Sequence, residues 1–223
     1  FGSRLHRRNR KGLCVHRRRE GLIAMGTQST DKSMIAGLNI GGHVIQVKRD
    51  IFSQVRRTKL GCLAPGGSGH SDKDAAGNFF FDYSDEVMMP IVDWLRELRD
   101  SRPEHPINPP VVKPTHRPAF IKMLLKLSFD GEHLRMAGIS AHDLWEVAGL
   151  GAAPLKEMGF DAAQLKLAHF TAKDLKEVGF TAQQLHTAGF VTWELKDSGY
   201  GARELQEAGY DKHELRTVGF EVQ

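Results

Sequence analysis

Length, composition and charge exclude several classes of protein. The chain has 223 residues, which suits one large domain or two small ones, and its 40% hydrophobic and 26% charged residues are enough for a packed core. No apolar run approaches 18 residues, so the sequence predicts no transmembrane segment. Its only cysteines, Cys14 and Cys62, cannot make a disulfide framework or a cysteine-based zinc site. They indicate a reducing compartment, and we expect a cytoplasmic protein.

Residues 1–33 read as a basic arm. Residues 1–30 hold eight Lys and Arg against one acid, Glu20, whereas residues 131–223 hold nine bases and 14 acids. This composition predicts a disordered, solvated tail, and one alternative is a nuclear-import or nucleic-acid tail. A mitochondrial presequence is another alternative, against which the segment is poor in serine and lacks a clear apolar face. Met25 is the first methionine, so a further alternative is that residues 1–24 are upstream of the native start. No interleaved aromatic side chains are present to stack on bases, so we expect no specific nucleic-acid recognition.

Residues 34–100 predict a small α+β domain. Positions 38–47 read as two strands around the tight turn Gly41-Gly42, and weak helical spacing follows at 49–57. Positions 79–83 then predict a short buried strand. Positions 88–99 predict a helix with Pro90 in its first turn.

Three motifs in this region resemble the BTB/POZ domain, in the branch found in the tetramerisation domains of voltage-gated potassium channels and in KCTD proteins. They are Leu38-Asn39-Ile40-Gly41-Gly42, Gly77-Asn78-Phe79-Phe80-Phe81-Asp82 and Ile91-Val92-Asp93-Trp94-Leu95-Arg96. The resemblance implies a homo-tetramer or homo-pentamer, and it implies a cullin ubiquitin ligase as a further partner. The chain departs from the family pattern at Tyr83-Ser84, where the family commonly has Arg-Asp, and it lacks the zinc-binding His/Cys cluster of some channel versions.

A proline-rich linker is predicted at 101–118. Six prolines in 18 residues exclude a helix interior and favour an extended, stiff spacer, with a proline-rich ligand for an aromatic groove as the alternative. A helix is predicted to restart at 119.

Residues 119–223 predict an all-α solenoid of short ten-residue repeats. Leucine recurs every ten residues from Leu134 onward, apart from one interval of eleven, and an aromatic residue follows most of these leucines by five. In the unit 171–180, Thr171 and Asp174 suit a capping box at the helix start, and Gly179 suits the left-handed end. The predicted core contains Leu155, Leu165, Leu175, Leu185, Leu195, Leu205 and Leu215, with aromatic residues such as Phe180 and Phe190.

The ten-residue repeat has one alternative fold, and it resembles one known kind of array. A pentapeptide β-helix would also place Leu and Phe five residues apart, but it needs small residues where this chain has Lys173, Trp193 and Arg203. The units resemble short-helix decapeptide arrays of the Ala-x-x-Leu-Lys-x-x-Gly-Phe kind, a resemblance that implies structure and no activity.

The sequence contains no pattern that predicts a catalytic, cofactor-binding or metal-binding residue. Eleven histidines are present, yet no H-x-x-x-H or H-E-x-x-H spacing occurs, and no G-x-S-x-G elbow is found. Trp94, Trp145 and Trp193 are expected as core or interface anchors. We therefore expect a non-enzymatic scaffold or adaptor that self-associates through residues 34–100 and presents its repeats to a protein partner. The alternative is the cytoplasmic assembly domain of a channel or other membrane protein, present here as a fragment.

Overall fold

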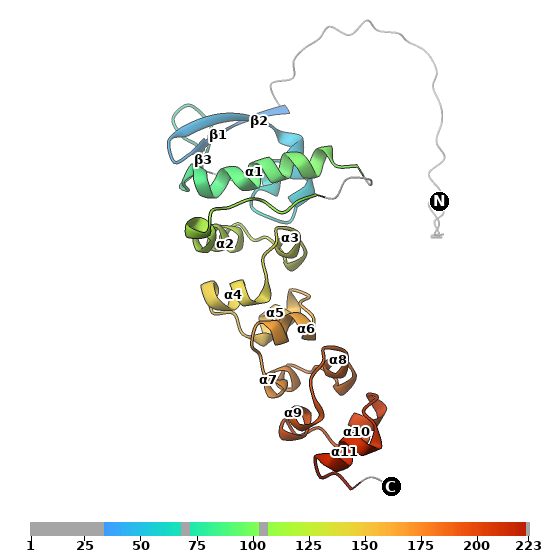
Figure 1. The fold of residues 1–223 in the computed structure, drawn as a ribbon. Coiled ribbons are helices and arrows are strands. Elements are labelled where there is room, and N and C mark those ends of the chain that lie inside the picture. Colours follow the sequence, from blue (N-terminus) through green and yellow to red (C-terminus); the bar gives the residue numbers. More distant parts are fainter. Residues whose placement is uncertain (1–33, 68–71, 103–106, 222–223) are drawn as a thin grey trace, which may run out of the picture. The chain divides into compact units, whose positions relative to one another are not determined.

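The computed structural model describes residues 34–67, 72–102 and 107–221, so the predicted basic arm lies outside the described residues. The strands are β1 (Ile35–Ile40), β2 (His43–Lys48) and β3 (Phe79–Phe81), and the short 3-10 helices are η2 (Arg49–Val55), η3 (Gly61–Leu63) and η4 (Pro114–His116). The α-helices are α1 (Asp85–Asp100), α2 (Arg117–Lys126), α3 (Gly131–Met136), α4 (Ala141–Ala148), α5 (Ala152–Glu157), α6 (Ala162–Leu167), α7 (Ala172–Glu177), α8 (Ala182–Thr187), α9 (Thr192–Asp197), α10 (Ala202–Glu207) and α11 (Lys212–Thr217) (Figure 1). The chain is thus an α+β region followed by a run of short helices, as the sequence predicts.

The sheet has the order β2-β1-β3, with β1 antiparallel to β2 and parallel to β3. The predicted turn at Gly41-Gly42 joins β1 to β2, and both glycines have positive φ, where a Cβ would be strained. Alternate residues of β1 are buried, as expected for a strand with one face on the core. Helix α1 lies across that inner face (Figure 1).

Strand β3 and helix α1 differ from the sequence prediction. Phe80 is 41% exposed, because it points to the uncovered outer face while Phe81 points inward. Helix α1 begins at Asp85, three residues earlier than predicted, so Pro90 lies in its second turn and not its first. The acidic side chains of Asp85 and Glu86 explain the earlier start, since negative charge is favourable at a helix N-terminus.

The α+β region and the first repeat helices contact each other directly. The Lys59 N–H donates to the carbonyl oxygen of Leu127 (2.9 Å), and His133 Nε2 lies 3.1 Å from the carbonyl oxygen of Gln54. Helix α1 also packs against α2. The proline-rich segment therefore connects two regions that touch. Helix α2 starts at Arg117 with Pro118 in its first turn, where a missing N–H costs no helical hydrogen bond.

The capping residues of unit 171–180 determine where its helix begins and ends. The Thr171 hydroxyl accepts a hydrogen bond from the Asp174 N–H, and the Asp174 carboxylate accepts one from the Thr171 N–H (2.8 Å). At the other end Gly179 has φ 79°, and the N–H of Phe180 donates to the carbonyl of Leu175 (2.9 Å). This is a Schellman ending. The resulting helix has six residues, about 9 Å in length.

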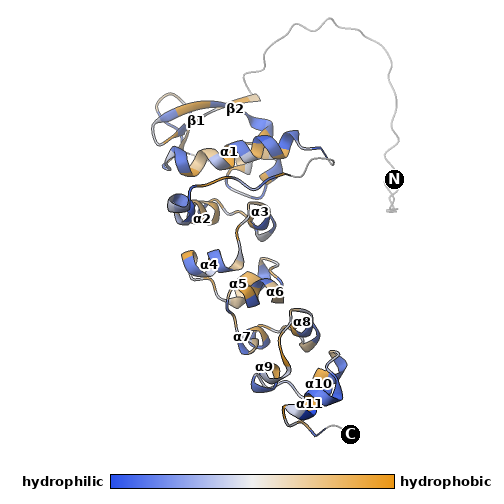
Figure 2. Ribbon diagram, in the orientation of Figure 1, coloured by the Kyte–Doolittle hydropathy of each residue, from blue (hydrophilic) through white to orange (hydrophobic). Residues whose placement is uncertain are grey.

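Helices two units apart pack against each other. Contacts join α4 to α6, α6 to α8, α8 to α10 and α7 to α9. The seven predicted core leucines from Leu155 to Leu215 are fully buried, and Phe180 and Phe190 are 6% and 4% exposed. In Figure 2 the helices of the array carry both hydrophobic and hydrophilic residues, as a helix with one buried side requires.

The β-helix alternative does not hold for the repeats, because residues 131–221 fold into helices and contain no strand. The positions that would have to point inward in a β-helix include Lys173 and Trp193, and both are exposed. Within the described ranges, no helix combines the length and the apolar character that crossing a bilayer requires.

A partly buried ion pair joins α4 to α2. The Arg117 guanidinium donates to both carboxylate oxygens of Asp143 (3.1 and 2.9 Å), and the Ser140 N–H and hydroxyl donate to the same carboxylate (2.8 and 2.7 Å). Burial alone would raise the pKa of Asp143, but the hydrogen bonds from Arg117 and Ser140 outweigh it and lower that pKa to about 2. The Asp143 carboxylate is thus ionised in the folded state and links α4 to Arg117 of α2.

Replacing Asp143 by Asn should lower the free energy of unfolding at pH 7 by roughly 1–2 kcal/mol. A carboxylate whose folded pKa of about 2 lies below its ordinary value of 3.8 stabilises the fold above pH 4 and loses that contribution as the pH falls toward 2. Urea unfolding at pH 7, 4 and 2.5 measures the effect. The difference between wild type and D143N should shrink as the pH falls, whereas Glu146→Gln on the same helix should change stability little at any pH. Parallel pH profiles for wild type and D143N would contradict the role of this ion pair.

Candidate functional site

A basic side chain in one repeat closes the end of the helix two repeats later. The Lys156 ammonium donates to the carbonyl oxygens of Val178 (2.6 Å) and Gly179 (3.0 Å) at the end of α7. The same nitrogen lies 4.7 Å from the centroid of the Phe180 ring. The last carbonyls of a helix have no partner inside it and carry partial negative charge, so a cation stabilises them. The ring face adds a cation–π contact.

This arrangement recurs along the array, and we call it the cation ladder. Its members are the basic residues that directly follow a core leucine and reach an aromatic ring two units on: Arg135 to Phe160, Lys156 to Phe180, Lys166 to Phe190, Lys176 to Tyr200 and Lys196 to Phe220. Each also donates to a backbone carbonyl at the end of the helix that it reaches. At the equivalent position in α8, the His186 ring meets the Tyr210 ring with centroids 4.4 Å apart.

Two tyrosine hydroxyls donate hydrogen bonds to carbonyl oxygens two units earlier in the chain. The Tyr200 hydroxyl donates to the carbonyl oxygen of Phe180 (2.6 Å), and the Tyr210 hydroxyl donates to that of Phe190. Burial raises the pKa of Tyr210 to about 12, and the charges of Glu214 and Glu194 add to this increase. Both hydroxyls therefore stay protonated near neutral pH and remain hydrogen-bond donors.

The cation ladder was not predicted from the sequence. From sequence alone, a lysine directly after a core leucine is expected to lie on the solvent-exposed face of a short helix. The available signal was its recurrence every ten residues, as at Lys156, Lys166 and Lys176, together with an aromatic residue 24 positions later. Only the packing of units two apart turns this spacing into a contact.

The ladder is replaced by a different contact at one step. Helix α4 absorbs the eleven-residue interval by extending to eight residues. Trp145 occupies the position of the cation, and His169 occupies the place of the closing glycine with φ 67°. The His142 ring packs between them, with its centroid 5.6 Å from that of Trp145 and 5.6 Å from that of His169. We call these three residues, together with Leu167, the irregular step.

The irregular step leaves large apolar side chains in contact with solvent. Leu167 is 78% exposed and Trp145 is 45% exposed. A hollow of about 330 Å³ is lined by Leu167, Phe160 and His142 among others. Trp193, farther along the array, is 61% exposed. Trp145 and Trp193 are therefore not core residues, and of the three tryptophans only Trp94 is buried. Large exposed aromatic side chains are enriched in protein interfaces.

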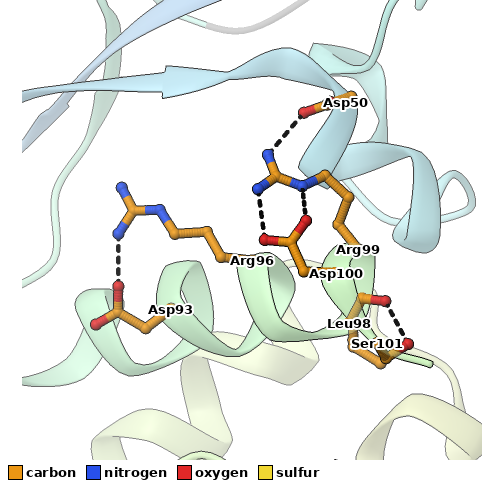
Figure 3. Close-up of polar contacts among 7 residues, drawn as sticks. All are labelled: Asp50, Asp93, Arg96, Leu98, Arg99, Asp100 and Ser101. Atoms are coloured by element: carbon orange, nitrogen blue, oxygen red, sulfur yellow. Dashed lines mark hydrogen bonds and ion pairs between the residues drawn. The ribbon is translucent and has the colours of Figure 1, made fainter.

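The residues of the three N-terminal motifs are distributed between the core and the surface. Leu38, Phe81, Trp94 and Leu95 are buried, and Gly41 and Gly42 form the turn. The Asn39 amide donates to the Asp74 carboxylate (2.9 Å), whereas Asp82 and Phe80 are exposed. Figure 3 shows Arg96 donating to Asp93 (2.6 Å) on α1, beside Arg99, which binds both Asp100 and Asp50.

Metal-binding groups are not clustered in the described part of the chain, where no set of three or more His, Cys, Asp or Glu side chains could hold an ion. The Cys62 sulfur donates to the carbonyl oxygen of Lys59 (2.7 Å). Cys14 lies outside the described residues. The cation ladder and the exposed apolar side chains of the irregular step are therefore the main candidate functional features of the described residues.

Comparison with known proteins supports the identification of residues 149–222 as a decapeptide repeat region. Residues 149–222 match the family model described as a decapeptide repeat region. That range contains α5 to α11 and thus most of the cation ladder. The comparison found no BTB/POZ family match. A search of curated proteins found no match.

Replacing Lys176 by Met should lower the free energy of unfolding by about 1–2 kcal/mol, because the variant loses the bond to the Gly199 carbonyl and the cation over Tyr200 while keeping the length of the side chain. Urea unfolding followed by circular dichroism measures this loss. Lys173→Met in the same helix is the matched control, since Lys173 is exposed and has no place in the ladder. Equal stabilities of the two variants would show that the ladder contact contributes nothing.

Proposed function

We propose that the protein is a non-enzymatic scaffold or adaptor. Its α+β region, residues 34–100, joins copies of the chain, and its helical array presents a surface to a protein partner. The BTB/POZ-like motifs support self-association, and the repeat family supports an array built from contacts between neighbouring units.

The observation that carries the proposal is the outer face of the sheet. Strand pairing places Val44, Asn39 and Phe80 side by side in one row across the three strands. Val44 is 52% exposed and Phe80 is 41% exposed, and Ile35 on the same face is 52% exposed. The opposite face packs against the core. The outer face, where Val44, Phe80 and Ile35 lie beside the polar Asn39, Gln46 and Lys48, is therefore the surface that a second copy of the region would cover.

The array supplies the surface for another partner. Its leucines and aromatic rings are occupied in packing between units, whereas Trp145, Leu167 and Trp193 are available on the outside. Aromatic side chains with large exposed area dominate the energetics of many protein interfaces. A cullin scaffold is the partner class that the BTB/POZ resemblance implies, and the cytoplasmic location expected from the cysteine content belongs to the same proposal.

Light scattering on the full chain tests self-association. Wild type should show a mass of four or five copies of the 24.9 kDa chain. Phe80→Lys should shift the protein toward the monomer, because the variant loses the exposed aromatic ring and the new charge must be desolvated when two copies meet. Met136→Lys is the matched control, since Met136 is exposed to a similar degree, 42%, but lies in α3. A monomeric wild type at high micromolar concentration would overturn the proposal, as would an F80K variant that assembles like wild type.

A further inference from the structure

A cleft lies between α1 and the segment that leads into α2, residues 107–116, which runs beside it (Figure 1). Its volume is about 520 Å³. One wall is the solvent-facing side of α1, from which Asp85, Glu86, Asp93 and Glu97 line the cleft. Glu86, Asp93 and Glu97 are spaced by seven and four residues, so they share one face of the helix. The other wall is formed mainly by Pro109, Pro110 and Val111, with Lys113 and His116 near its end.

The cleft carries an excess of negative charge. Four carboxylates line it, against the ammonium of Lys113 and the ring of His116. Two of the carboxylates have partners at the surface: Asp93 accepts from Arg96 (2.6 Å), and Asp85 contacts His43. Glu86 and Glu97 form no ion pair with any residue that the structure describes, and both are exposed. Two carboxylates are therefore available to an incoming cation.

The second observation concerns buried nitrogen atoms that lack partners. Within the described residues, two buried side-chain nitrogens have no hydrogen-bond partner, Trp94 Nε1 and His116 Nδ1, and both belong to residues that line this cleft. Trp94 is only 2% exposed, and its indole N–H can act only as a donor. Burying a donor without an acceptor costs roughly 1–3 kcal/mol. An acceptor supplied by a ligand in the cleft would remove this cost.

We propose that this cleft binds an extended basic peptide segment of a partner protein. Lysine or arginine side chains of the peptide pair with Glu86 and Glu97, and a peptide carbonyl oxygen accepts the indole N–H of Trp94. The aliphatic stems of the basic side chains lie against Pro109 and Pro110, which present an apolar wall. Neutral or acidic segments are disfavoured, because they would leave the carboxylates of α1 without counter-charges.

This surface is separate from the two surfaces in the proposed function. Helix α1 covers the inner face of the sheet, so its cleft is on the side opposite the row formed by Val44, Asn39 and Phe80. The irregular step belongs to α4 and α6 of the array. Peptide binding can therefore succeed or fail independently of self-association, and the F80K variant distinguishes the two.

The test uses the full chain and the peptide acetyl-Ala-Arg-Ala-Arg-Ala-Arg-Ala-amide, labelled for fluorescence anisotropy. Wild type should bind this peptide and should not bind its counterpart with Glu in place of Arg. The double variant Glu86→Gln/Glu97→Gln should weaken binding about tenfold. The double variant Glu157→Gln/Glu177→Gln, which removes two exposed carboxylates of the array, is the matched control and should bind within about twofold of wild type.

A second measurement reports on Trp94 directly. In protein labelled with ¹⁵N-tryptophan, the peptide should shift the indole N–H resonance of Trp94, which is identified from Trp145→Phe and Trp193→Phe variants. Spermine, which has positive charges but no carbonyl acceptor, should leave that resonance in place and compete weakly for the cleft. Wild-type affinity in E86Q/E97Q, equal binding of the Arg and Glu peptides, or peptide binding that leaves the Trp94 resonance unmoved would each overturn the proposal.

Discussion

The array depends on the bond between a cation in one repeat and the helix end two repeats later. A helix of six residues is too short to be stable alone, because its few backbone hydrogen bonds do not offset the conformational entropy lost on nucleation. In α7 the N-terminus is satisfied within the unit by the capping box of Thr171 with Asp174, whereas the carbonyls of Val178 and Gly179 accept hydrogen bonds from Lys156, two units earlier. The helices that accept such a bond, α5, α7, α8, α9 and α11, therefore depend on the unit two positions earlier. Stability accumulates along the array as a sum of such contacts.

The same dependence explains why the irregular step stands out. Where Trp145 replaces the cation and His169 replaces the glycine, a cluster of rings takes over the contact between α4 and α6. His169 holds a left-handed conformation that glycine adopts at lower cost. The exchange leaves Leu167 and Trp145 at the surface. The regular array thus contains one irregular contact, at which apolar side chains are exposed.

Much of this architecture could be predicted from local sequence signals for burial, helix capping and positive φ. Leu175, Thr171 and Gly179 each specify their place in a unit through burial, capping and positive φ, and the structure has them in these roles. The hairpin at Gly41-Gly42 follows in the same way. Features that depend on packing at a distance were not predictable: the reach of Lys156 to the end of α7, the exposure of Phe80, and the bond from Lys59 to Leu127. Each is decided by which elements lie adjacent, and residue spacing alone does not determine that.

A double-mutant cycle on Lys176 and Tyr200 tests the central claim most directly. Urea unfolding of Lys176→Met, Tyr200→Leu and the double variant gives the coupling free energy between the two side chains, whose ammonium and ring centroid are 4.5 Å apart. The same cycle with Lys173→Met supplies a pair that makes no such contact. If the cation ladder holds successive units together, Lys176 and Tyr200 should couple by about 0.5–2 kcal/mol while the Lys173 cycle is additive. Additive losses in both cycles would contradict the account.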